Sequence, residues 1–458
     1  MSSTELLRRE WTAFRTPGRL LSLAVAALSV IALGLLFTGG TSSGVSDTFW
    51  FRHQDLGRDG SITVRMTSMT GTITYPPPGH DQIVAGLVPW AKAGIIVKDG
   101  LRQGSRYAAL AMTGGHGVRF QHDYVHDVAG SAGRTPRWLR LTRSGDTITG
   151  SESADGEQWH VVGTAELTGL PETVQVGLFA TSPGDLTLVE TGLGGTIEQV
   201  RFTQAVGVFD HVSVDGGTGS WGSESVGEMN HTDWEKFHNA SGAVEKDGVV
   251  TISGAGDIGP IGEGGARGVE KPLGGLVIAL IIVLVVAARY GARGASSRIA
   301  VPAAVVGAAT FVTGLVAVTP LLPGVQVIVG VAAVLALCAV LSYGLGLWLR
   351  RGRAAILVGL TLVAVPYAVT AVPLLPDAVA DWLLRFTPAA AFAVTQTAVE
   401  HPQVTAHYAP SAGYFPLPGW AGFAVLCAYV TLVLWLASPG SPGSARTPLR
   451  EPLPGSSG

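Results

Sequence analysis

Charged residues are scarce in this chain of 458 residues: only 14% are Asp, Glu, Lys or Arg, whereas 47% are hydrophobic. Soluble globular chains usually carry about a quarter charged residues. The deficit is concentrated between Leu273 and Ala437, where long runs have no ionisable side chain. The net charge of −3 offers no basic surface for nucleic acid, so we expect no nucleic-acid partner.

Cysteines and catalytic motifs are equally scarce. The two cysteines, Cys338 and Cys427, both lie in apolar runs, so no disulfide can stabilise the rest of the chain. No Gly-Lys pair occurs, which excludes a phosphate-binding Walker loop, and no His-Glu-x-x-His helix is present. We therefore expect this chain to be no enzyme and to bind no nucleotide, cofactor or metal of its own.

Long apolar runs are what the sequence has in abundance. A membrane span needs about 20 mainly apolar residues to cross about 30 Å of hydrocarbon. Six runs qualify, at residues 20–37, 273–288, 299–322, 325–349, 354–375 and 419–437. The first run is longer than a usual signal peptide and has no Ala-x-Ala cleavage site after it, which favours a retained span. The sequence predicts a membrane bundle of six helices.

The distribution of arginine predicts how the spans are oriented. Arginines flank the first span on its N-terminal side and separate the second from the third and the fourth from the fifth, whereas the intervening loops are poor in them. Because positive loops stay in the cytoplasm, both termini are expected there. Residues 40–270 and the loop 376–418 are then extracytoplasmic, and residues 438–458 form a disordered cytoplasmic tail of a multi-pass cell-membrane protein.

Residues 1–19 have the pattern of an interfacial helix. Leu7, Trp11 and Phe14 recur at helical spacing, and arginines lie mostly on the other side of the helical wheel. Such a helix lies along the inner leaflet with Trp at the interface and arginines toward headgroups. A plain positive flank that fixes the topology explains the same residues equally well.

The segment between the first two spans is expected to be all-β. Alternating runs such as 61–66, 94–98 and 138–143 are separated by Asp-Gly and Ser-Gly turns, a pattern that predicts a β-sandwich over residues 45–215. A Gly-rich β and linker region over 216–268, with an alternating run at 248–253, leads back to the membrane.

Two features of this segment bear on binding. His122 and His126, with Asp123 and Asp127 beside them, have the residue types of a transition-metal site, although a polar edge of the sheet explains them more simply. Separately, Trp90, Tyr107 and Trp159 are rings that either bind sugars or pack in the core.

Several stretches of the membrane part resemble one protein family. They are Leu6-Leu7-Arg8-Arg9-Glu10-Trp11, Gly307-Ala308-Ala309-Thr310 in the third span, Gly344-Leu345-Gly346-Leu347-Trp348 in the fourth, and Tyr414-Phe415-Pro416-Leu417-Pro418 before the sixth. Together they resemble the bacterial type-2 ABC transporter permeases. The resemblance covers residues 1–40 and 270–437, and the stretches around Gly94 and Trp138 resemble concanavalin-like jelly-roll domains.

That resemblance implies a permease subunit of an ABC-type exporter that forms a homo- or heterodimer and is driven by a separate cytoplasmic ATPase subunit. The family's ATPase-coupling stretch is shortened here, and Tyr290, Arg293 and Arg298 are the matching residues. No span has a central charged residue, which argues against an ion-coupled carrier. The alternative is a non-transporting, membrane-anchored protein whose β-sandwich binds a carbohydrate or envelope ligand.

Overall fold

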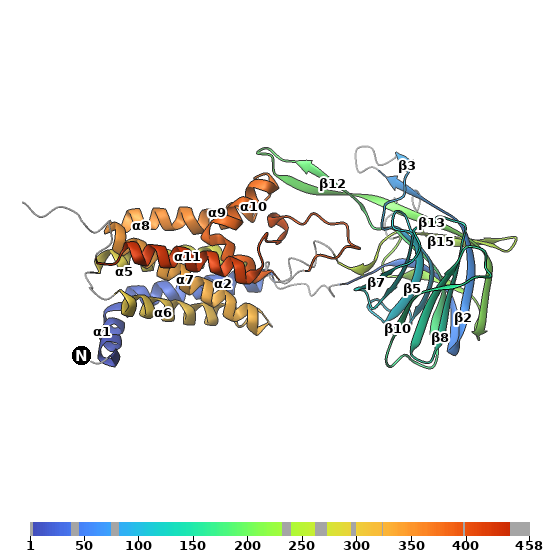
Figure 1. Cartoon of the computed structure of the whole chain (residues 1–458), viewed down its shortest axis with the longest axis horizontal. Coiled ribbons are helices and arrows are strands. Elements are labelled where there is room, and N and C mark those ends of the chain that lie inside the picture. The colour runs from blue at the N-terminus through green and yellow to red at the C-terminus, as the bar shows by residue number, and fades with distance from the viewer. Residues whose placement is uncertain are drawn as a thin grey trace, which may run out of the picture.

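The computed structural model describes residues 3–37, 45–74, 82–230, 240–261, 273–294, 299–322, 324–396 and 399–439. The chain forms an elongated molecule in which a helical bundle and a β domain lie end to end (Figure 1). The bundle is built from residues near both ends of the chain, and the β domain is inserted after its first long helix.

Six helices of the bundle are long and apolar enough to cross a membrane. Five of them are continuous α-helices: α2 (Pro17–Phe37), α5 (Leu276–Arg293), α6 (Ala300–Val318), α7 (Val325–Leu349) and α11 (Gly419–Leu436). Between α7 and α11 the remaining candidate span, Gly352–Thr370, is divided into α8 (Gly352–Gly359), a π-helical turn η2 (Leu360–Ala364) and α9 (Val365–Thr370). The prediction of six membrane-type helices is confirmed.

The widened turn in this composite helix has a local cause. Pro366 has no backbone N–H, and its ring conflicts with the carbonyl one turn earlier in a regular α-helix. The π turn at Leu360–Ala364 lies directly before it. Single π turns are frequent at functional sites in helices.

Helix α1 (Ser3–Phe14) does not continue the direction of α2. Arg15 and Thr16 separate the two, and α1 projects at a steep angle from the end of the bundle that lies farthest from the β domain (Figure 1). Its Phe14 is fully buried in a cluster with Val283, Ala303 and Tyr343. The hydrophobic face predicted for residues 1–19 is therefore partly used to dock this helix on the bundle.

Small residues allow the central helices to pack closely. At the α5–α7 contact, a Cβ on Gly291 would lie 2.2 Å from the Tyr343 carbonyl oxygen, and one on Gly346 would lie 2.4 Å from that of Ala288. The buried Ser342 hydroxyl donates a 2.8 Å hydrogen bond to the Leu284 carbonyl across the same contact. Close backbone approach and interhelical hydrogen bonds are the usual means of helix association in membranes.

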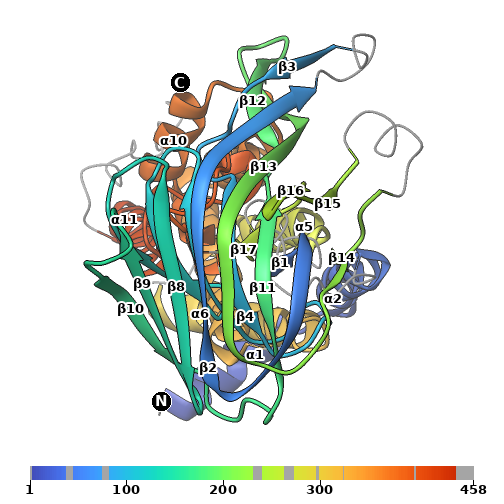
Figure 2. The same ribbon diagram turned by 90° about the vertical axis from the view of Figure 1, so that its right-hand side faces the viewer.

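The β domain is antiparallel, and two very long strands run through it side by side: β2 (Phe49–Thr74) and β13 (Thr196–Gly217) (Figure 2). The other strands are β1 (Val45–Asp47), β3 (Ile83–Ala85), β4 (Lys92–Lys98), β5 (Tyr107–Thr113), β6 (Val118–His122), β7 (His126–Ala129), β8 (Arg137–Ser144), β9 (Thr147–Ser153), β10 (His160–Glu166), β11 (Val174–Thr181), β12 (Asp185–Glu190), β14 (Gly222–Val226), β15 (Gly242–Lys246), β16 (Val249–Gly254) and β17 (Ile258–Pro260).

These strands form one sheet of 15 strands and a separate pair, β1 and β17, rather than two facing sheets. The N-terminal part of β2 pairs with β11, and its C-terminal part pairs with β8 and β13. The strand therefore passes through both walls of a sheet that curls over a single core containing Leu56, Val64 and Phe120. The all-β prediction is confirmed, but the domain is a nearly closed, barrel-like sheet rather than a clear sandwich, because local alternation does not reveal that one strand serves both walls.

Shorter elements connect α9 with α11 at the end of the bundle that faces the β domain (Figure 1). Between α9 and α11 lie α10 (Asp377–Phe386) and the 3-10 helices η3 (Pro388–Thr395) and η4 (Pro410–Ala412). The hairpin of β12 with the start of β13 extends from the β domain toward α10 as a projecting arm (Figure 1). The region 216–268 contributes β14, β15 and β16 to the same large sheet.

Candidate functional site

The end of the bundle where α1 lies, farthest from the β domain, holds the predicted coupling residue Tyr290. Its hydroxyl donates a 3.1 Å hydrogen bond to a Glu10 carboxylate oxygen, and its ring packs edge-on against Phe14, 5.3 Å between centroids. The Arg19 guanidinium lies 4.7 Å from the centroid of the same ring. Tyr290 thus fastens α1 to α5 rather than facing outward, a role that its place in the sequence did not reveal.

Arg293, the second predicted coupling residue, is exposed at the same end. It lines a cavity of about 460 Å³ together with Thr16, Arg19 and Arg289. Arg298, the third, lies outside the described residues. The structure therefore brings Tyr290 and Arg293 to one end of α5, with Tyr290 turned inward and Arg293 turned outward.

Positive charge accumulates on this end of the bundle. The turn between α7 and α8 is at the same end as α1 (Figure 1). The described arginines of these segments are Arg8, Arg9, Arg15, Arg19, Arg289, Arg293, Arg350, Arg351 and Arg353. Such a surface is electrostatically complementary to an acidic protein partner or to anionic headgroups.

The β domain meets the bundle at the opposite end (Figure 1). The arm tip rests on the segment before α10: the Thr191 hydroxyl donates a 2.9 Å hydrogen bond to the Pro373 carbonyl. Thr196 lies 3.2 Å from an Asp377 carboxylate oxygen, which is 2.7 Å from His407 Nε2. The backbone N–H of His407 in turn donates to Glu198. Polar groups of the arm and of the loop between η3 and η4 therefore form one cluster.

A second contact joins the same loop to another part of the β domain. The buried Gln403 donates a 3.1 Å hydrogen bond from Nε2 to the Val125 carbonyl in the β6–β7 turn. Besides the chain connections themselves, the β domain therefore contacts the loops at this end of the bundle at two separate points.

The candidate metal ligands His122 and His126 lie close together in that β6–β7 hairpin. His122 and His126 face each other across the hairpin, stacked with 4.4 Å between ring centroids, because Asp123 and Tyr124 turn the chain with positive φ. Burial, reinforced by the neighbouring His126, lowers the pKa of His122.

The carboxylates beside these histidines are turned to other partners. Asp123 pairs with Arg106 at 2.7 Å, and Asp127 pairs with Arg119 at 2.9 Å. Within the described ranges no group of three or more His, Cys, Asp or Glu side chains is arranged to hold a metal ion. The pair forms the polar edge that was the simpler interpretation.

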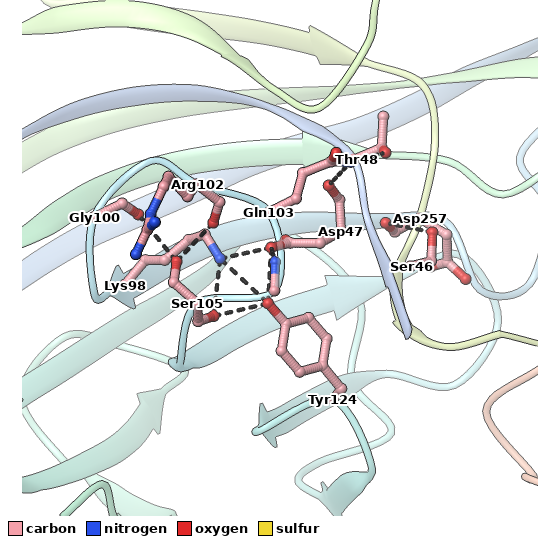
Figure 3. A network of polar contacts seen from close by, with 11 residues as sticks. Ser46, Asp47, Thr48, Lys98, Gly100, Arg102, Gln103, Ser105, Tyr124 and Asp257 are labelled. Carbon is pink, nitrogen blue, oxygen red and sulfur yellow. Dashed lines mark hydrogen bonds and ion pairs between the residues drawn. The ribbon is translucent and has the colours of Figure 1, made fainter. Parts of the chain in front are cut away.

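A buried charge network lies at the base of the β domain, and sequence analysis did not find it. Lys98 Nζ is 2.6 Å from Asp47 Oδ2, and both side chains are almost fully buried (Figure 3). The Tyr124 hydroxyl lies 2.7 Å from the same carboxylate oxygen, which also accepts a 2.8 Å hydrogen bond from the Gly104 N–H. Burial lowers the pKa of Lys98 and raises that of Tyr124.

A second ion pair repeats this arrangement at the other end of β4. Lys92 Nζ is 2.9 Å from Asp257 Oδ1 and also donates to the Ile258 carbonyl. Asp47 is in β1 and Ile258 in β17, the paired first and last strands of the domain. The two lysines thus fasten both chain connections to β4, and the sequence signal was the placement of two of only five lysines at the ends of one apolar run.

The aromatic rings singled out from the sequence separate into two groups. Trp90 is 5% exposed and Tyr107 is fully buried, so both pack in the core. Trp159 is half-buried on the outer surface, with the Arg140 guanidinium 3.9 Å from its ring centroid. Trp138 lies on the same strand as Arg140 and contacts Arg65 and His211, forming an aromatic and cationic strip on β2 and β8.

Comparison with known proteins identifies no family. No protein-family model matches the chain, and no curated protein matches it. Among solved structures, the chain is similar to a functionally unknown protein from Saccharomyces cerevisiae, with 16% identity, TM-score 0.20 and coverage of 37% of this chain and 74% of that one.

Two other structural likenesses involve enzymes. The GH43 protein BlXynB from Bacillus licheniformis matches with 16% identity and TM-score 0.21 over 35% of this chain and only 28% of its own length. SCP-B, a member of the eqolisin family of peptidases, matches with 9% identity and TM-score 0.26 over 46% of this chain and 98% of its own. At these TM-scores the likenesses assign no activity to this chain.

Proposed function

We propose that this chain is the permease subunit of an ABC-type exporter, which forms a dimer and is driven by a separate cytoplasmic ATPase subunit. The observation that carries the proposal is α1, which is attached to the arginine-rich end of a bundle of six membrane-type helices through Phe14 and Tyr290. In this arrangement the termini and the arginines face the cytoplasm, as the distribution of positive charge requires.

The geometry supports a route from the ATPase to the outer side. A partner that binds the arginine-rich end touches both α1 and the end of α5, which the Tyr290–Glu10 hydrogen bond connects. Helices α5 and α7 are packed backbone to backbone, so a displacement of α5 is transmitted to its neighbours. The far end of α5 leads back to β17, which Lys92 fastens to the β domain.

The test is association with an ABC-type ATPase subunit from the same organism. We expect the two to copurify after co-expression and the reconstituted complex to hydrolyse ATP faster than the ATPase alone. Arg289→Glu with Arg293→Glu should weaken association, whereas Arg102→Glu with Arg134→Glu, the same charge change at exposed sites of the β domain, should not. Absence of both copurification and stimulation with the unaltered chain would overturn the proposal.

A second candidate function is favoured by the strip of Trp138, Arg140 and Trp159. We infer as the alternative that the chain is a non-transporting membrane-anchored protein whose external domain, jelly-roll-like as its sequence indicates, binds a carbohydrate or envelope ligand through these planar groups. Exposed aromatic faces combined with arginine donors suit stacking on sugar rings and hydrogen bonding to hydroxyls. The full chain should then bind polysaccharide, and Trp159→Ala should remove that binding without any ATPase present.

A further inference from the structure

An apolar groove lies on the outside of the bundle between α2 and α6. Its volume is about 400 Å³, and the groove exists because alanines face each other where the two helices approach. Its lining includes Trp11, Leu20, Ala24, Ala27, Ala308 and Val312. The hydroxyl of Thr313, which also lines it, is already bonded to the Ala309 carbonyl at 2.9 Å, so the groove presents an apolar surface to its occupant.

The groove is about as long as one leaflet is deep. Its lining runs from Leu20 to Ala27 on α2 and from Ala308 to Val316 on α6. At 1.5 Å per residue these segments are about 10 Å and 12 Å long. The hydrocarbon of one leaflet is about 15 Å deep, half of the full thickness of the bilayer.

One end of the groove is closed by α1. Trp11 contributes to the lining, yet its side chain is 41% exposed, so the indole stands at the rim. Arg8, three residues before Trp11 on α1, and Arg15, which directly follows α1 and donates its backbone N–H to the Trp11 carbonyl, are both exposed. Neither forms an ion pair within the part of the chain that the structure describes.

We propose that this groove binds one acyl chain of an anionic phospholipid from the leaflet in which α1 lies, with the headgroup next to Arg8 and Arg15. The apolar lining, the indole at the rim and the two arginines beyond it match the order of acyl chain, interface and phosphate along a lipid. The inference rests on the membrane placement in the proposed function and is independent of transport.

The length of the groove favours a lipid over a second copy of the chain. A transmembrane helix that packed along α2 and α6 would continue through the whole bilayer, about 30 Å. This groove ends at α1 after less than half that distance. An acyl chain extends over only about one leaflet, about 15 Å, so its length fits the groove.

The test is lipid retention by the full chain, purified in mild detergent and measured by native mass spectrometry. Phosphatidylglycerol and phosphatidylcholine with identical acyl chains are added in turn. We expect a preference for phosphatidylglycerol that falls about fivefold for each of Arg8→Gln and Arg15→Gln. Arg9→Gln removes the same charge two residues from Trp11, on the far side of the helix, and should leave the preference unchanged.

Filling the groove provides a second, independent measurement. Ala24→Leu with Ala308→Leu should abolish retention of both lipids, whereas Ala32→Leu with Ala428→Leu, the same change at exposed positions outside the groove, should not. The proposal is overturned if the filled variant retains as much lipid as the unaltered chain. It is also overturned if the filled variant loses self-association of the chain instead of losing lipid. Copurification with the ATPase is measured on the same variants, so failure of the transport proposal is seen separately.

Discussion

At the scale of single residues, the buried lysine at the base of the β domain, Lys98, depends most strongly on its partners. Lys98 has no exposed surface, and its ammonium group is held by the Asp47 carboxylate. Burial alone disfavours both charges, and only their pairing and the surrounding hydrogen bonds compensate. Because Asp47 lies in β1 and Lys98 in β4, the pair fastens β1 to β4 (Figure 3).

Removal of one partner should be far more damaging than removal of both. Lys98→Met leaves the Asp47 carboxylate buried without its counter-charge, at a cost of about 3–5 kcal/mol in the free energy of unfolding. Lys98→Met with Asp47→Asn should recover most of that loss. Denaturation of the detergent-solubilised chain, followed by tryptophan fluorescence, measures both, with the exposed Lys246→Met as control. Equal stability of the single and double variants would contradict this interpretation.

Acid sensitivity is expected from a different ion pair on the outer surface. A hydrogen bond from Arg65 holds the pKa of Asp210 at about 2, below its ordinary value of 3.8. Because the folded-state pKa is lowered, the stabilisation is complete above about pH 4 and is lost as the pH falls toward about 2. Asp210→Asn should flatten this part of the stability profile, as measured by circular dichroism during acid titration, and an unchanged profile would argue against it.

At the scale of elements, the α5–α7 contact depends on two glycines. Added side chains at Gly291 or Gly346 would meet backbone atoms of the facing helix, which cannot rotate away. The same residue type elsewhere is permissive: no atom lies within 4 Å of a Cβ built on Gly18. The close approach of the two helices therefore requires glycine at positions 291 and 346, whereas no such close contact requires glycine at position 18.

We expect Gly346→Leu to push α7 from α5 and destabilise the bundle by about 1–3 kcal/mol. The buried Cys338 on α7 provides the measurement, because a thiol-reactive dye labels it only when the bundle opens. The exposed Cys427 is first replaced by serine. Gly18→Ala is the control, and its labelling temperature should be equal or slightly higher because alanine favours the helix. Equal temperatures for Gly346→Leu would show that the contact is pliable.

At the scale of the whole molecule, the arm formed by β12 and β13 connects the β domain with the bundle (Figure 1). A Cβ on Gly195 would lie 2.2 Å from the Pro373 carbonyl oxygen, whereas one on Gly192, three residues earlier in the same turn, meets nothing within 4 Å. These two positions distinguish docking of the tip from its folding.

Gly195→Trp should displace the arm from the Pro373 segment, and Gly192→Trp should leave the arm in contact with that segment. Glu198, which accepts the hydrogen bond from the His407 N–H, then becomes accessible to a glutamate-specific protease. We expect cleavage of the full chain after Glu198 to accelerate in the Gly195 variant only. Equal rates in the two variants would mean that the arm does not depend on this contact.

The sequence by itself determined the elements whose signal is local. Apolar runs longer than about 18 residues predicted the six membrane-type helices, since only a helix satisfies its backbone in hydrocarbon. Alternation and Asp-Gly turns predicted antiparallel strands for the same kind of local reason. Tyr290 and Arg293 became candidate residues by a different path, through the resemblance of the membrane part to a permease family, and no local pattern singled them out.

Only the tertiary structure decided which distant residues meet. The Lys98–Asp47 pair joins residues 51 positions apart, and the Lys92–Asp257 pair joins residues 165 apart. No local pattern encodes such pairings, because they arise from how the sheet curls around its core. The same reason explains why a sandwich was expected where the sheet is nearly closed, why Tyr290 turned inward to α1, and why the apolar groove beside Trp11 became visible only in the assembled bundle.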